Sequence, residues 1–345
     1  MVAVPLHHAK AQLVARIAVD AEGRVAGLMI QPAAAAPASA PAVPADAAYD
    51  EREMHVGDGA RALPATLAMP KGAGPFPAVV LVHGSGPHDR DQTIGPNRPF
   101  MDIARGLAAQ GIAVLRYEKR TKAHPQEFAG VFGIDQETTF DAVMAVDALR
   151  RTQGVDAKRV FVLGHSQGGM LAPRIAATSG HVAGLILLAA PARSLLDIVI
   201  EQNRRLAVLD DGRTSDAERT AINGLVEQVR VIRDAATPDA TRTVMGLPAG
   251  YWRSVEAVDA VADARDVGLP MLILQGARDI QVVDADWGRW RGAFHDNEKA
   301  SFKLYETLNH LGIAGEGDGN LAEYNTPGRV DATLIGDIAR WIKAH

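Results

Sequence analysis

A serine flanked by glycines lies where an apolar run meets a helical pattern. Gly164-His165-Ser166-Gln167-Gly168 follows the apolar residues 160–163 and precedes residues with helical spacing. A strand–turn–helix context suits a nucleophilic serine, because the sharp turn exposes its hydroxyl and small neighbours let the backbone fold closely past itself. The helix N-terminus also favours negative charge beside it. The pattern therefore predicts Ser166 as a nucleophile, and an idle serine in a glycine-rich turn is the alternative.

A serine hydroxyl is a poor nucleophile, so Ser166 needs a histidine base and a carboxylate that orients the base. Two later segments predicted to be strands, residues 271–275 and 302–306, are each followed by one of these groups. Asp279 follows the first strand after a glycine turn, and His310 follows the second. The order serine, aspartate, histidine is that of hydrolases built on an open α/β sheet, whose active sites lie at the carboxyl edge of the strands.

Acyl transfer also requires backbone N–H groups that stabilise the negative oxygen of the tetrahedral intermediate. His83-Gly84-Ser85-Gly86 follows another apolar run, so its amides are expected at the same edge of the sheet. We predict an oxyanion hole formed by the N–H groups of Ser85 and Gln167, with Gly86 as the alternative to Ser85. His83 fits packing or hydrogen bonding at the end of a strand better than the role of base.

Several other polar and aromatic residues have two interpretations. Asp284 and Asp286 lie beyond Asp279 and are reserve candidates for the acid. The Asp-Arg-Asp segment at residues 89–91 either fixes the oxyanion loop and contacts substrate or forms a buried ion-pair network, and we favour the network. Tyr251 and Trp252 either bind substrate or pack among the surrounding helices.

Strands alternate with helices from residue 49 to residue 345, which predicts an α/β fold with a mostly parallel central sheet covered on both faces. The expected strands are residues 78–83, 112–117, 160–164, 184–190, 271–275 and 302–306, and the expected helices are residues 100–110, 138–151, 167–178 and 331–344. Residues 192–265 are helical and rich in charge, so we interpret them as a helical cap inserted between two strands, with peripheral helices remote from the site as the alternative.

The first 48 residues have a different pattern. Residues 11–19 and 24–30 predict a β-hairpin, and because an isolated hairpin is marginally stable, we interpret residues 1–30 as the remnant of a preceding domain. Residues 31–48 contain four prolines among many alanines, which predicts a linker.

Composition narrows the chemistry and the partners. The chain has no cysteine, which excludes disulfides, thiolate metal sites and a cysteine nucleophile, and we predict no metal and no cofactor. Its 36 basic and 41 acidic residues are interspersed, which argues against nucleic acid as a partner. The longest apolar run is too short to insert into a membrane, and no signal peptide is visible, so we expect a cytoplasmic protein. A trimmed N-terminus would fit an extracytoplasmic one equally, and the oligomeric state is left open.

These segments together resemble the α/β-hydrolase superfamily. More narrowly, they resemble bacterial esterase-like and serine aminopeptidase-like members that carry the oxyanion motif His-Gly-Ser-Gly-Pro-x-Asp-Arg-Asp, here residues 83–91. The resemblance continues through residues 115–121, 274–279 and 308–310 and covers roughly residues 50–345. It implies an α/β-hydrolase fold and a serine hydrolase.

We expect this hydrolase to act on small to medium carboxylic esters through an acyl-enzyme, because such esters demand least of the cap. The alternative is a serine aminopeptidase, or another amide or thioester hydrolase with the same triad. An aminopeptidase would need an acidic pocket for the substrate amine, which Glu201, Asp210 and Asp211 would have to supply. A non-catalytic binding protein is least favoured, since it has no need of all three triad residues.

Overall fold

The computed structural model describes residues 2–8, 11–19, 25–32, 40–209 and 212–345. The chain divides into two compact units, residues 1–42 and 43–345. The first unit contains a three-stranded antiparallel sheet formed, in this order, by β1 (Val2–His8), β2 (Ala11–Val19) and β3 (Val25–Pro32).

This small sheet differs from the expected hairpin by one strand. Strand β2 has the expected bounds, β3 begins at Val25, and β1 is an additional strand that the sequence analysis missed. Residues 20–24, where the hairpin turn was expected, and residues 33–39 of the expected linker lie outside the described residues. The interpretations of residues 1–30 as the remnant of a domain and of residues 31–48 as a linker stay predictions.

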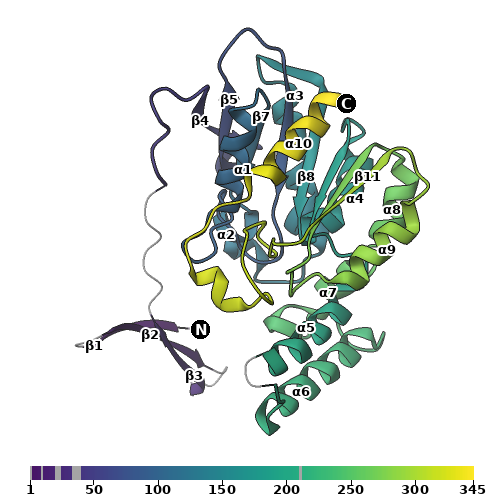
Figure 1. The fold of residues 1–345 in the computed structure, drawn as a ribbon. Coiled ribbons are helices and arrows are strands. Elements are labelled where there is room, and N and C mark those ends of the chain that lie inside the picture. The colour runs from purple at the N-terminus through teal and green to yellow at the C-terminus, as the bar shows by residue number, and fades with distance from the viewer. Residues whose placement is uncertain (1, 9–10, 20–24, 33–39, 210–211) are drawn as a thin grey trace. The chain divides into compact units, whose positions relative to one another are not determined.

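The second unit is built on an eight-stranded sheet with the order β11-β10-β9-β8-β6-β7-β5-β4 (Figure 1). Strands β6 to β11 run parallel, while β5 pairs antiparallel with both β7 and β4. The strands are β4 (Tyr49–Val56), β5 (Leu63–Pro70), β6 (Phe76–Val82), β7 (Ala113–Tyr117), β8 (Val155–His165), β9 (Leu185–Leu188), β10 (Met271–Gly276) and β11 (Ala300–Tyr305).

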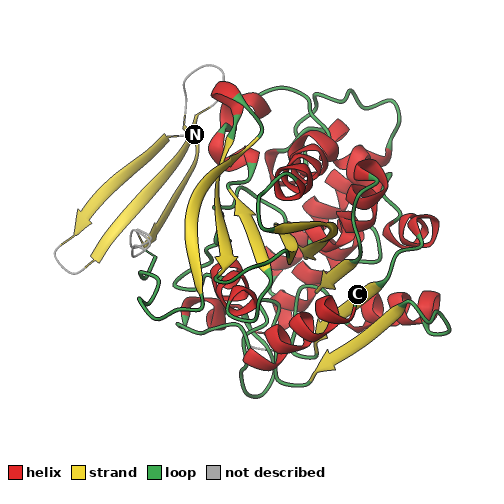
Figure 2. Ribbon diagram, turned by 90° about the horizontal axis from the view of Figure 1, so that it is seen from above, coloured by secondary structure: helices red, strands yellow, loops and turns green. Residues whose placement is uncertain are grey.

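Helices cover both faces of this sheet, as the view from above shows (Figure 2). Helices α1 (Pro99–Ala108) and α10 (Ala332–Ala344) share one hydrophobic core with alternate strand residues such as Val79 and Leu81. The other core contains Val80 together with α3 (Phe140–Arg150), α4 (Gln167–Ser179), α8 (Ala260–Val267) and α9 (Asp284–Phe294). Strands buried on both faces read as continuous apolar runs, which is why the central strands were expected correctly. The predicted fold class is confirmed.

Strands β4 and β5 and helix α9 of the second unit were not predicted. The helix expected over residues 138–151 begins instead with a π-helical turn, Asp135–Thr139, that leads into α3. Short helical segments complete the unit: Gly59–Arg61, α2 (Arg120–Ala123), Pro125–Phe128, Val244–Gly246 and Leu321–Asn325.

A helical insertion lies between β9 and β10 and consists of α5 (Leu195–Leu209), α6 (Asp216–Arg233) and α7 (Ala249–Glu256). These helices pack against one another, and Figure 1 shows α5 and α6 beside each other and apart from the sheet. Helix α8, also within residues 192–265, packs on α4 and so belongs to the layer that covers the sheet. None of the described helices is both long and apolar enough to cross a membrane.

Candidate active site

Ser166 lies in the turn between β8 and α4, in a backbone conformation that residues other than glycine rarely adopt. Its φ and ψ angles are 54° and −124°. Glycines are required on either side, because a Cβ on Gly164 would lie 2.1 Å from the carbonyl oxygen of Gly168, and one on Gly168 would lie 2.3 Å from that of Val82. The turn therefore holds Ser166 in a strained conformation and leaves it partly exposed between buried neighbours, as a nucleophile requires.

Asp279 and His310 form a buried pair at the ends of β10 and β11. Nδ1 of His310 lies 2.7 Å from Oδ2 of Asp279. The other oxygen of Asp279 accepts hydrogen bonds from the backbone N–H groups of Gln281 (2.8 Å) and Val282 (3.0 Å). The carboxylate is thus fixed and orients the imidazole, so that Nε2 is the ring nitrogen left to act as a base.

His165, the residue before Ser166, connects the serine turn to the loop of His310. Its Nε2 donates to the carbonyl oxygen of His310 (2.8 Å), and the two imidazole rings lie 4.6 Å apart. Its Nδ1 accepts a hydrogen bond from Nε2 of Gln92 at 2.7 Å. Burial, and next the charge of His310, lowers the pKa of His165 well below its ordinary value, so this ring is neutral. The three predicted triad residues therefore converge at the carboxyl edge of the sheet.

The loop that follows β6 lies against the serine turn, where the oxyanion donors were expected. A Cβ on Gly84 would lie only 3.3 Å from Cβ of Ser166, so the Gly84–Ser85 peptide adjoins the nucleophile. The backbone N–H of Gly84 donates to Oε1 of Gln92 at 3.1 Å. Within the described residues, the N–H groups of Ser85 and Gln167 have no protein acceptor. Both are therefore available to an oxyanion beside Ser166.

A buried lysine lies behind this loop, and no local signal in the sequence marks it as a site residue. Nζ of Lys119, at the end of β7, forms an ion pair with Oε1 of Glu137 (2.9 Å) and donates to the carbonyl oxygen of Gly84 (2.9 Å). The hydroxyl of Tyr251 donates to the other oxygen of Glu137 (2.8 Å) and accepts from Nε2 of Gln167 (3.2 Å). We call Lys119, Glu137, Gln167 and Tyr251 the lysine network.

The two aromatic residues predicted to bind substrate have different surroundings. Tyr251 is buried, and its hydroxyl reaches Gln167, the residue after Ser166. Trp252 is buried within the helical insertion, where its Nε1 donates to the carbonyl oxygen of Val244 (3.0 Å) and its ring packs edge-on against Tyr251. Packing accounts for Trp252, whereas Tyr251 also contacts the serine turn.

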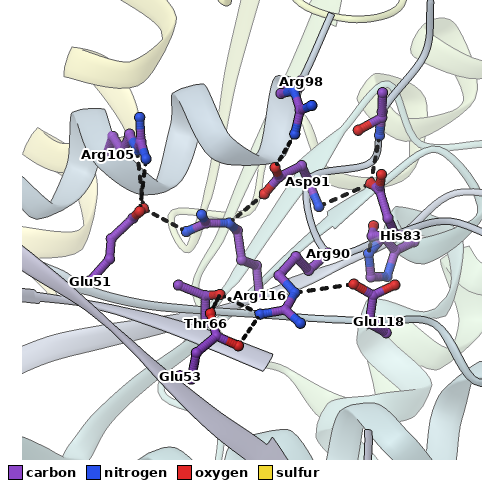
Figure 3. Close-up of polar contacts among 12 residues, drawn as sticks. Glu51, Glu53, Thr66, His83, Arg90, Asp91, Arg98, Arg105, Arg116 and Glu118 are labelled. Atoms are coloured by element: carbon purple, nitrogen blue, oxygen red, sulfur yellow. Dashed lines mark hydrogen bonds and ion pairs between the residues drawn. The ribbon is translucent and has the colours of Figure 1, made fainter. Parts of the chain in front are cut away.

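The Asp-Arg-Asp segment forms part of an extended set of ion pairs, drawn in Figure 3. Asp91 pairs with Arg116 (2.7 Å) and Arg98 (2.9 Å), and Arg116 also pairs with Glu51 (2.9 Å). We call this set the arginine network; its members are Glu51, Glu53, Thr66, Arg90, Asp91, Arg98, Arg105, Arg116 and Glu118. Of the two interpretations of residues 89–91, these contacts agree with the ion-pair network.

Asp89, the first residue of that segment, holds the loop itself through hydrogen bonds within it. Oδ1 of Asp89 accepts hydrogen bonds from the N–H groups of Asp91 (3.1 Å) and Thr93 (2.9 Å). The carbonyl oxygen of Asp89 accepts a hydrogen bond from Nε2 of His83 at 3.0 Å. His83 is buried between Phe100 and Tyr117, and this burial lowers its pKa well below the ordinary value. It therefore supports the loop as a neutral residue.

The reserve carboxylates have other partners or positions. Asp286 is fully buried and accepts from Arg193 (2.7 Å) and from the N–H of Ala192 (2.8 Å). Asp284 is an exposed residue at the start of α9. Glu201, proposed for an amine pocket, is paired with Arg193 at 2.8 Å. Asp210 and Asp211 lie outside the described residues.

Comparison with known proteins places the chain in a family. Residues 74–316 match the family described as serine aminopeptidase, S33. The chain belongs to this family of α/β-hydrolases. Esterase EstD of Thermotoga maritima is 38% identical over 336 residues, which are 96% of this chain and 77% of that esterase. The resemblance to α/β-hydrolases that the sequence indicated is confirmed, and the present chain is a hydrolase.

Solved structures share the fold at lower identity. Est1E from Butyrivibrio proteoclasticus is 18% identical and superimposes with a TM-score of 0.52 over 85% of this chain and 99% of its own. The esterase domain from a Rhodothermus marinus protein is also 18% identical, with a TM-score of 0.52 over 86% of this chain and 98% of its own. At such identities the likeness concerns the fold alone.

Proposed function

We propose that the protein hydrolyses carboxylic esters of small molecules through an acyl-enzyme on Ser166. The observation that carries the proposal is the buried Asp279–His310 pair beside the strained serine turn. Nε2 of His310 takes the proton of the Ser166 hydroxyl as its oxygen attacks the ester carbonyl, and Asp279 stabilises the imidazolium.

The N–H groups of Ser85 and Gln167 bind the oxyanion of the tetrahedral intermediate. Collapse of this intermediate expels the alcohol, which takes the proton from His310, and leaves the acyl group on Ser166. A water molecule then gives a proton to His310 and attacks the acyl carbonyl, which releases the acid and restores the serine hydroxyl.

Esters are favoured over aminoacyl amides because the described acids considered for binding a substrate amine are already paired. An aminopeptidase needs a carboxylate that is free to bind the substrate amine. Glu137, the acid linked to Gln167 through Tyr251, is already paired with Lys119. Glu201 is likewise paired with Arg193. Esterase EstD, which matches 96% of this chain, is an esterase, whereas the family description names an aminopeptidase. Amide hydrolysis is therefore the second candidate.

The helical insertion is proposed as the cap that shapes the substrate pocket. Helix α7 brings the hydroxyl of Tyr251 to Gln167, next to the nucleophile, so this helix lies over the N-terminus of α4. Tyr251 is accordingly the better placed of the two aromatic candidates for lining the pocket. Trp252 supports it through edge-on packing.

The test compares wild type with Ser166→Ala on p-nitrophenyl acetate and butyrate and on aminoacyl nitroanilides. We expect ester hydrolysis by wild type, and a kcat about 10⁶-fold lower for Ser166→Ala, as when the nucleophile is removed from other serine hydrolases. Ser301→Ala, at an exposed serine, is the matched control and should keep full activity. Labelling by a fluorophosphonate that persists in Ser166→Ala would refute the nucleophile, and a higher kcat/KM on the nitroanilides would favour the peptidase.

A further inference from the structure

Lys119 is enclosed in the protein directly behind the proposed oxyanion donors. Its side chain is only 2% exposed. The ammonium group contacts Gly84 and Glu137, each at 2.9 Å, and lies 3.5 Å from Oε1 of Gln167. Burying an ammonium group is expensive unless it is fully paired, so its position beside the site calls for an explanation.

The carbonyl group that Lys119 binds belongs to the same peptide unit as the Ser85 N–H. This peptide is trans, so its C=O and N–H point in opposite directions. When Lys119 holds the carbonyl oxygen of Gly84, the N–H of Ser85 is directed away from the lysine. A cation on the carbonyl oxygen also withdraws electron density from the amide nitrogen, which makes the N–H a stronger donor.

The same ammonium group contacts the other half of the proposed oxyanion hole. Oε1 of Gln167 faces Lys119, and Nε2 of Gln167 donates to Tyr251, so this side chain is held at both ends. The backbone of Lys119 contributes as well, since its N–H donates to the carbonyl oxygen of His88 at 3.0 Å. Lys119 thus connects both donor segments to β7.

Glu137 holds the lysine in place and lies in the π-helical turn before α3. Such turns are frequent at functional sites, because they displace one residue from the regular helical register. Glu137 is itself buried, and its second oxygen accepts from Tyr251. Glu137 therefore balances the charge of Lys119, and it is Lys119 that contacts the carbonyl oxygen of Gly84.

We propose that Lys119 is a positioning residue that orients and polarises the Gly84–Ser85 amide for stabilisation of the oxyanion. The inference rests on the proposed function, because it requires the Ser85 N–H to act as a donor. Without the lysine, the Gly84–Ser85 peptide is free to rotate and present its carbonyl oxygen to the site. The effect falls on the transition state, and so on kcat far more than on KM.

The first experiment measures kcat and KM on p-nitrophenyl butyrate for Lys119→Met. It also measures inhibition by a trifluoromethyl ketone, which forms a tetrahedral oxyanion on the serine. We expect kcat to fall about 10²-fold, as when an oxyanion donor is lost, with KM changed less than about 3-fold. The inhibition constant should rise by the same factor as kcat falls. Lys122→Met, at an exposed lysine on α2, is the control and should match wild type.

Two further variants separate positioning from a structural role. Glu137→Gln keeps the contact between Lys119 and Gly84, so we expect it to retain kcat within about 10-fold of wild type. The double variant Lys119→Met with Glu137→Gln leaves no buried charge unpaired, so it should stay folded and yet lose kcat like Lys119→Met.

The possible outcomes separate the inference from the proposed function. If Glu137→Gln loses as much activity as Lys119→Met, in parallel with the melting temperature, the ion pair is structural and the inference is wrong. If the folded double variant matches wild type in kcat and in the inhibition constant, the inference about Lys119 is wrong while the proposed function still holds. If wild type neither hydrolyses the ester nor binds the ketone, it is the proposed function that fails.

Discussion

The two walls of the proposed active site are constructed in different ways. The triad wall consists of Ser166, Asp279 and His310, which follow the parallel strands β8, β10 and β11, and a 2.7 Å hydrogen bond joins His310 to Asp279. The oxyanion wall is the loop at residues 83–92. Ion pairs of the arginine network support it (Figure 3), and so does the hydrogen bond from Lys119 to the carbonyl oxygen of Gly84. We therefore expect damage to the triad wall to abolish catalysis with little effect on stability, and damage to the oxyanion wall to affect both.

The largest expected effect is that of Asp279→Asn on the triad wall. We expect kcat to fall about 10⁴-fold, because the amide no longer holds His310 in the tautomer that leaves Nε2 free to accept a proton. The amide oxygen can still accept from Gln281 and Val282, so the melting temperature should change little. Steady-state kinetics and thermal unfolding measure the two quantities.

Asp286→Asn is the matched control for that prediction. Asp286 is paired with Arg193, whereas Asp279 is the acid paired with His310, so the loss of Asp286 should lower the melting temperature while kcat of the folded protein is retained. If Asp279→Asn kept the wild-type kcat and Asp286→Asn were inactive, Asp286 and not Asp279 would be the acid of the triad.

A smaller effect is expected from Arg116→Met in the arginine network. Arg116 is 3% exposed and bonds both Asp91 and Glu51, so its removal leaves one buried and one partly buried carboxylate with fewer partners. Breaking a buried pair typically costs 3–5 kcal/mol, and we expect about 3 kcal/mol here because Arg98 and Arg105 remain. Urea unfolding measures the loss.

The control for this variant is Arg219→Met, which removes an exposed ion pair with Asp216 and should leave stability unchanged. The distinction between the walls predicts that Arg116→Met also lowers kcat, because Asp91 belongs to the oxyanion loop. A variant that is destabilised but fully active would show that the arginine network supports the sheet alone.

The triad wall could be predicted from the sequence because its signals are local. Ser166 and Asp279 each follow an apolar run that forms a strand buried on both faces, whereas His310 follows the partly exposed edge strand β11. Parallel strands bring their carboxyl ends to one edge of the sheet. The serine turn adds its own glycine pattern. The order of the three residues then leaves few choices, and the structure brings Ser166, Asp279 and His310 together.

The supports of the oxyanion wall could not be predicted in this way, because their burial depends on distant partners. Strand β4 carries Glu51 and Glu53 in a charged segment that does not read as a strand, yet their partners come from α1, β7 and the loop at residues 83–92. Lys119 looks like a surface lysine until Glu137 is placed against it. Strand β1 was missed for a different, local reason, since Pro5 argues against a regular strand.

The smallest expected effect concerns His88 in the oxyanion wall and depends on pH. Nε2 of His88 donates to the carbonyl oxygen of Ser85 at 2.7 Å. Burial, and next the charge of Lys119, lowers the pKa of His88 to about 4. In the unfolded chain the group has its ordinary pKa near 6.5, so the unfolded state takes up the proton first as the pH falls.

The free energy of unfolding should therefore be nearly unaffected by His88 well above pH 6.5 and fall between pH 6.5 and about 4, by about 2.5 kcal/mol. His88→Gln tests this, since its amide can still donate to Ser85 but does not titrate. We expect equal stability of variant and wild type at pH 7.5, measured by urea unfolding, and a more stable variant at pH 4.5. Parallel stability curves for the two proteins would contradict the assignment. They would also mean that the acid sensitivity of the oxyanion wall lies with its carboxylates, whose ion pairs weaken as they take up protons.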